Sequence, residues 1–169
     1  MVPILEVWFN DWRHAFDSKE KMTEQALTKE EAQALLKMEK VPQPGIKPEP
    51  FPGLGGRIKV PLQSMNGREK FLFDITTKRI ALTTSYQTRA RQVYVLARLD
   101  FNAPHTNPDG TKIGVPHLHL YSEKYGDKVA YPVPEGLLSN PASKSAVLED
   151  FMRFCNIKSC VIEIDLFGQ

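Results

Sequence analysis

The sequence predicts an α+β fold in which an antiparallel β-sheet packs against a helix near the C-terminus. From residue 57 onward, apolar and polar residues alternate in short runs, as in half-buried strands. Asn66-Gly67 is a strong two-residue hairpin signal between two of these runs. Apolar residues then recur at helical spacing over 147–154. Consecutive strands joined by short turns favour a meander, which could be open or barrel-like.

Composition places the chain among ordinary globular proteins. It has 169 residues, 41% of them apolar and 25% charged, which is enough for one domain with a core. A formal charge of +2 does not by itself indicate nucleic-acid binding. The sequence has no run of 18 apolar residues, so it predicts no membrane span. Glu6 interrupts the short apolar stretch at the start, which does not fit a signal peptide. We therefore expect a cytoplasmic protein in which Cys155 and Cys160 are reduced thiols.

The chain divides into three parts by composition. Residues 1–40 are expected to form an N-terminal helical arm, with aromatic residues at near-helical spacing at its start and a capping box at Thr28 and Glu31. Residues 41–56 are rich in proline and glycine, which favours an extended linker. Residues 57–169 are expected to form the α+β core domain that carries the site.

The elements of the core domain follow from its alternation and turn signals. A helix is expected from Asn140, as its cap, to about Cys155, with Pro141 at its first position. Strands are expected over residues 57–62, 71–74, 78–86, 91–101, 115–122, 128–131 and 161–164.

Three of the four histidines lie within fifteen residues of one another. His105 is in a loop rich in turn residues, and His117 and His119 are two residues apart in the strand expected over 115–122. Side chains two apart in a strand point to the same face. That face would carry His117, His119, Tyr121 and Glu123, with Leu118 and Leu120 facing the core.

The leading hypothesis is acid–base cleavage of RNA by a metal-independent endoribonuclease without a cofactor. Histidine titrates near neutral pH, so two imidazoles can supply the base for the 2′-hydroxyl and the acid for the leaving oxygen. A cation would bind the phosphate. The candidate catalytic residues are His105, His117, His119 and Tyr125, and the candidate substrate-binding residues are Arg98, Arg91 and Lys124.

Two alternatives use the same histidines differently. The imidazoles could bind a divalent transition metal, with the candidate ligands His105, His117, His119 and Glu123. His117-x-His119 with Glu123 resembles the first metal motif of cupins, although no histidine follows His119 to supply the second motif. In the other alternative the histidines are structural, and the chain is a non-enzymatic phage or defence interaction protein.

A second resemblance is carried by an ordered series of motifs. They are His105-Thr-Asn-Pro-Asp-Gly110, Pro116-His-Leu-His119, Glu123-x-Tyr-Gly-Asp-Lys128 and Leu148-Glu-Asp-Phe-Met-x-Phe-Cys-Asn156. Over about residues 57–166 the chain resembles an uncharacterised bacterial and phage family with a domain of unknown function. The resemblance implies an association with toxin–antitoxin systems, and hence RNA and an antitoxin protein as partners. It implies no oligomeric state.

Overall fold

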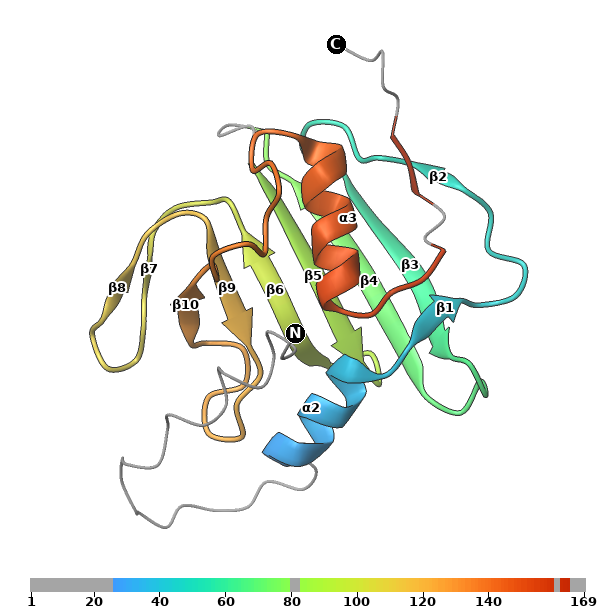
Figure 1. Cartoon of the computed structure of the whole chain (residues 1–169), viewed down its shortest axis with the longest axis horizontal. Coiled ribbons are helices and arrows are strands. Elements are labelled where there is room, and N and C mark those ends of the chain that lie inside the picture. The colour runs from blue at the N-terminus through green and yellow to red at the C-terminus, as the bar shows by residue number, and fades with distance from the viewer. Residues whose placement is uncertain (1–25, 80–82, 160–161, 165–169) are drawn as a thin grey trace.

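The protein is built on a seven-stranded antiparallel sheet, seen in a computed structural model that describes residues 26–79, 83–159 and 162–164 (Figure 1). The strand order is β1-β3-β4-β5-β6-β9-β10, so β3 to β6 form the expected meander. The sheet is open, with β1 and β10 at its edges, and not a closed barrel. The strands are β1 (Lys40–Pro42), β3 (Arg57–Ser64), β4 (Lys70–Thr77), β5 (Thr84–Ala90), β6 (Tyr94–Asp100), β9 (His117–Leu120) and β10 (Ala130–Pro132).

Two helices and two short strand pairs complete the described part of the chain. Helix α3 (Lys144–Phe154) lies across one face of the sheet, and α2 (Lys29–Lys37) lies at one end of it (Figure 1). The short pairs are β2 (Glu49–Pro50) with β11 (Ile162–Glu163), which is parallel, and the hairpin β7 (His105–Thr106) with β8 (Lys112–Ile113). Among these residues, no helix is long and apolar enough to cross a membrane.

The face of the sheet toward α3 forms the apolar core. The ring of Phe151 on α3 lies 6.1 Å from the rings of both Phe73 and Tyr86. Tyr86 pairs with Leu99, which pairs with Leu118 on β9, and all are at most 2% exposed. Because side chains alternate along a strand, the residues on either side of Leu99 in β6 and of Leu118 in β9 point to the opposite face. The α+β prediction, with the C-terminal helix on the sheet, is therefore confirmed.

Helix α2 belongs to the same core. Its predicted capping box is present: Glu31 N–H donates to the Thr28 hydroxyl at 3.1 Å, and Thr28 N–H donates to the Glu31 carboxylate at 2.9 Å. Leu35 and Leu36 are buried against the sheet residues. The helix ends at Lys37 and does not reach residue 40.

Parts of the segment predicted as a linker, residues 41–56, form strands in the structure. Lys40 to Pro42 form edge strand β1, which pairs with β3, and Glu49–Pro50 form β2. Proline lacks an N–H group, and a sheet tolerates it at an edge strand, where one side makes no ladder bonds. The proline-rich composition therefore marks an edge strand and a surface segment rather than only a linker.

Several predicted element limits are corrected. The strand expected over 78–86 runs instead from Thr84 to Ala90, because Lys78 is in the turn after β4, where its N–H donates to the Thr83 carbonyl at 2.8 Å. Residues 80–82 lie outside the described residues. The strand expected over 91–101 begins at Tyr94, since Arg91 and Gln92 have positive φ in the preceding turn. The C-terminal helix begins at Lys144 with Ser143 as its cap. The predicted aromatic helix before residue 17, Cys160 and Val161 also lie outside the described residues.

A buried lysine connects the ends of both helices. The Lys40 ammonium donates to the carbonyls of Leu36 at 2.8 Å, Met38 at 2.7 Å and Cys155 at 2.8 Å. It also lies 4.8 Å from the centroid of the Phe71 ring. The last carbonyls of a helix have no intrahelical partner, so this side chain satisfies groups that would otherwise be buried and unpaired. Burial lowers the pKa of Lys40 to about 8.

Replacing Lys40 by Met should destabilise the fold by about 2–4 kcal/mol, because three buried carbonyls lose their donor. Urea unfolding followed by circular dichroism measures the change. Lys37→Met, at an exposed position of α2, is the matched control and should change stability by at most about 0.5 kcal/mol. Equal midpoints for the two variants would contradict the role assigned to Lys40.

Candidate functional site

The site begins with the pairing of β6 and β9. In this register Asp100 lies opposite His117, and Arg98 lies opposite His119. All four side chains therefore lie on the face of the sheet away from α3. His117 is 2% exposed and His119 is fully buried, so this polar face is covered at this point.

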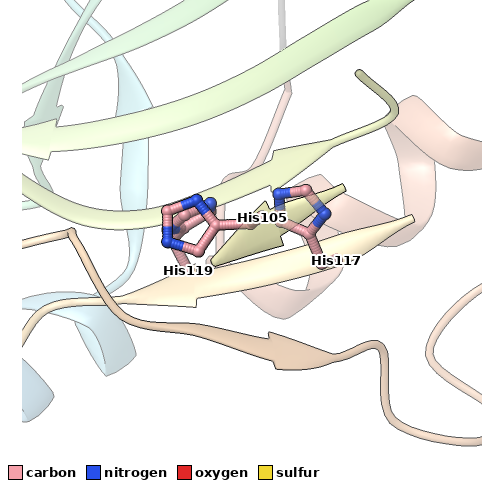
Figure 2. A group of neighbouring side chains, drawn as sticks. All are labelled: His105, His117 and His119. Atoms are coloured by element: carbon pink, nitrogen blue, oxygen red, sulfur yellow. The ribbon is translucent and has the colours of Figure 1, made fainter. Parts of the chain in front are cut away.

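The cover is the β7–β8 hairpin, which carries His105. The Asn107 side chain fixes the hairpin to edge strand β10: it donates to the Ala130 carbonyl at 2.9 Å and accepts from the Ala130 N–H at 2.7 Å. The ring centroid of His105 consequently lies 4.7 Å from that of His119 and 5.7 Å from that of His117 (Figure 2). The fold thus brings together three histidines from two elements.

Each imidazole has one ring nitrogen hydrogen-bonded to a backbone carbonyl. His117 Nδ1 lies 2.9 Å from the Gly114 oxygen, His119 Nδ1 2.8 Å from the Asp127 oxygen, and His105 Nε2 2.8 Å from the Lys128 oxygen. A carbonyl oxygen only accepts, so we assign the N–H to these nitrogens. In the neutral rings the lone pairs are then on His117 Nε2, His119 Nε2 and His105 Nδ1.

One potential ligand atom from each ring lies within 4.8 Å of the other two. His105, His117 and His119 form the one group of this kind found among the described residues, and Glu123 is not part of it. The Nε2 atom of His119 is buried and has no hydrogen-bond partner. A buried polar atom without a protein partner is unusual, and an imidazole nitrogen in this position can bind an ion or a water molecule.

Two carboxylates and Arg98 border the histidines. Arg98 Nε donates to Asp100 Oδ2 at 2.9 Å, and its Nη1 donates to the Asp127 carboxylate. The same Asp100 oxygen lies 3.6 Å from His119 Nε2 and 3.9 Å from His117 Nε2. Arg98 therefore holds a carboxylate beside two imidazoles, and both of its described ion pairs are with protein carboxylates.

The protonation state of His119 follows from this environment. Burial lowers its pKa, the positive charge of Arg98 lowers it further, and nearby Asp100 raises it, with a resulting pKa of about 4. His119 is therefore a neutral imidazole at pH 7. A neutral ring with a free Nε2 lone pair is the form of histidine that binds metal ions.

The structure places the other candidate residues elsewhere. Lys124 and Tyr125 lie in the turn at 122–126, where the Lys124 ammonium is 5.0 Å from the Tyr125 ring centroid. Arg91 precedes the first residue of β6, whereas Asp100 is the last residue of that strand, and Arg91 pairs with Glu69. Arg98 is the candidate substrate-binding residue that lies beside the histidines: it is opposite His119 in the β6–β9 ladder and donates to Asp100.

The predicted alternation along 117–123 holds for the histidines and then stops. Strand β9 ends at Leu120, so Tyr121 and Glu123 do not continue its face. The Tyr121 hydroxyl donates to the Leu27 carbonyl at 3.2 Å, and the Glu123 carboxylate accepts from Lys29 N–H at 3.0 Å. Tyr121 thus contacts the residue before the cap of α2, and Glu123 contacts its first residue, where a carboxylate also meets the positive end of the helix dipole. Glu123 as a metal ligand is therefore not supported.

Sequence reasoning missed Asp100 and Asn107. Asp100 shares a face with Arg98 by strict alternation, and pairing the strand expected over 91–101 with the His-x-His strand would have placed both beside the histidines. The role of Asn107 had no such signal, because it depends on contact with a strand 23 residues away.

The metal-free protein should lose stability as the pH falls from 6.5 to 4. Because the pKa of His119 is lowered on folding, the unfolded chain binds the proton more readily, and acid favours unfolding. The shift corresponds to about 3 kcal/mol at most. In His119→Gln, whose side chain does not titrate, the loss over this range should be smaller. Urea midpoints measured with chelator at several pH values test this, and parallel curves for the two proteins would contradict it.

Comparisons with known proteins place the chain in an uncharacterised family. No curated protein and no solved structure matches the chain. A family described as a family of unknown function (DUF6978) matches residues 27–157, which include α2, the sheet, all three histidines and α3. The match covers most of the chain, and the protein belongs to this family of unknown function.

Proposed function

We propose that this protein binds a divalent transition metal through His105, His117 and His119. The observation that carries the proposal is the shared arrangement of the three rings. Each has one nitrogen held by a backbone carbonyl, which leaves the other nitrogen with a free lone pair. One potential ligand nitrogen from each ring lies within 4.8 Å of the other two. Histidine ligands of metal sites commonly donate their second N–H group in this way, which fixes both tautomer and ring orientation.

The geometry requires a modest contraction on binding. Two ligand atoms about 2.1 Å from a tetrahedral zinc are about 3.4 Å apart, whereas the three ring atoms lie within 4.8 Å of one another. His117 and His119 are on β9, which is paired on both sides, but His105 is on a two-stranded hairpin and is half-buried. A small movement of the hairpin toward β9 would shorten the distances from His105 to the other two rings.

Metal binding is better supported than acid–base catalysis by the same histidines. A general base or acid for RNA cleavage works best with a pKa near the operating pH, and the pKa of His119 is about 4. Arg98, the candidate phosphate ligand, is already paired with Asp100 and Asp127. A neutral, buried imidazole with an unpartnered nitrogen suits a metal ligand.

Imidazole ligands suit zinc, iron, cobalt, nickel and copper, so the donor set alone does not select among them. A metal in this position would join the β7–β8 hairpin to strand β9. Since a metal that binds only the folded state adds to its stability, about 2.7 kcal/mol is gained at a free concentration one hundred times the dissociation constant.

The purified protein should bind one equivalent of Zn²⁺ or Co²⁺ and unfold at a higher temperature with the metal than with chelator. His105→Ala should weaken binding at least about tenfold, because one of the three ligands is lost, with little effect on the metal-free fold. Metal analysis after dialysis, titration calorimetry and thermal unfolding measure these effects.

The matched control is His14→Ala, the same substitution at the fourth histidine of the chain, outside the family match. It should bind metal like the wild type. Failure of the wild-type protein to bind any of these metals would overturn the proposal. Cleavage of RNA by fully chelated protein, lost in His105→Ala, would instead favour the acid–base mechanism.

A further inference from the structure

We infer that Asp100 is the fourth ligand of this centre, so that the protein provides three imidazoles and one carboxylate to the metal. The inference rests on the proposed function and extends it to a residue outside the histidine group. It defines the site as suited to a divalent cation that accepts both nitrogen and oxygen ligands, such as Zn²⁺, Fe²⁺, Co²⁺ or Mn²⁺.

Distance is the first argument. Asp100 Oδ2 lies 3.6 Å from His119 Nε2 and 3.9 Å from His117 Nε2. Ligand atoms on one tetrahedral metal are about 3.4 Å apart. The spacing between the carboxylate oxygen and both β9 imidazole nitrogens is therefore close to the spacing of two ligand atoms on one metal, and little movement is required. Asp100 and His117 are also direct partners in the β6–β9 ladder, which fixes the spacing of their backbones.

The second argument concerns donors and acceptors. With the N–H groups of His117 and His119 assigned to Nδ1, both Nε2 atoms present lone pairs, and neither can donate to Asp100. A carboxylate oxygen and two imidazole lone pairs then face one another in a buried place, where Asp100 is 8% exposed. Like partial charges at this range repel one another, and a cation between them removes the repulsion.

Arg98 does not account for this arrangement by itself. Its Nε approaches Asp100 Oδ2 from the neighbouring position on the same strand, while its Nη1 pairs with Asp127. A carboxylate oxygen has more than one lone pair, so it can accept from Arg98 and still bind a metal. Arg98 is then a positioning residue that aims Asp100, and Asp127 contributes both a carboxylate to Arg98 and its backbone oxygen to His119.

A fourth protein ligand has a chemical consequence. Zinc with four protein ligands is coordinatively complete, as in sites that stabilise a fold or sense metal. Metals that take five or six ligands keep open positions for water or substrate. The charge also changes, because one carboxylate reduces a dication to a net charge of +1 at the centre, whereas three neutral imidazoles leave it at +2.

Sulfur substitution at position 100 tests the inference directly. In Asp100→Cys, a thiolate bound to Co²⁺ should produce a near-ultraviolet sulfur-to-cobalt charge-transfer absorption that the wild-type protein lacks. A cysteine that does not touch the metal cannot produce it. Asp100→Asn keeps the shape of the side chain but removes its charge, and it should lower Co²⁺ affinity at least about tenfold and alter the visible cobalt spectrum.

Asp127→Cys is the matched control, because Asp127 is the other carboxylate partner of Arg98. It should show no charge-transfer absorption, and the natural cysteines are common to all the proteins compared. The role of Asp100 is overturned if the wild type binds Co²⁺, Asp100→Cys lacks the absorption, and Asp100→Asn keeps the wild-type spectrum and affinity. In that case the three-histidine centre stands. If the wild type binds no metal, the proposed function itself fails.

Discussion

The pairing register of β6 and β9 is the constraint on which the rest of the site depends. It sets Arg98 opposite His119 and Asp100 opposite His117 on one face, and Leu99 opposite Leu118 on the other. A shift by one residue would turn the histidines into the core and the leucines out of it. The buried apolar face toward α3 therefore stabilises the same register that assembles the polar group.

The polar group is buried because a hairpin covers it, and that cover has its own anchors. Asn107 supplies two hydrogen bonds to one residue of β10, and His105 adds one to the Lys128 carbonyl. Buried polar groups are costly unless they are satisfied, and the hydrogen bonds around the three rings satisfy one nitrogen of each. The nitrogens that remain distinguish this group from three ordinary core histidines.

The two helices are held by polar contacts as well as by apolar packing. Lys40 joins the C-terminal ends of α2 and α3 through three carbonyls, while Tyr121 and Glu123 hold the start of α2. Since residues 121 and 123 directly follow β9, the strand that carries two of the histidines also fixes the position of α2. Residues 27–40 are thereby part of the structure that supports the site.

Local patterns in the sequence were enough to predict the α+β class, the meander, the capping box at Thr28 and the common face of His117 and His119. Each of these depends on alternation along one segment or on residues a few positions apart. It also indicated His105 as the third member. Three further features became clear from the folded chain: β1 forms one edge of the sheet, Glu123 contacts a helix instead of joining the histidines, and Asp100 lies beside two imidazoles. These outcomes depend on where β9 ends and on which strand lies next to it. Both are set by contacts between residues far apart in the chain, such as Lys29 and Glu123, which are 94 positions apart, and local patterns carry no information about them.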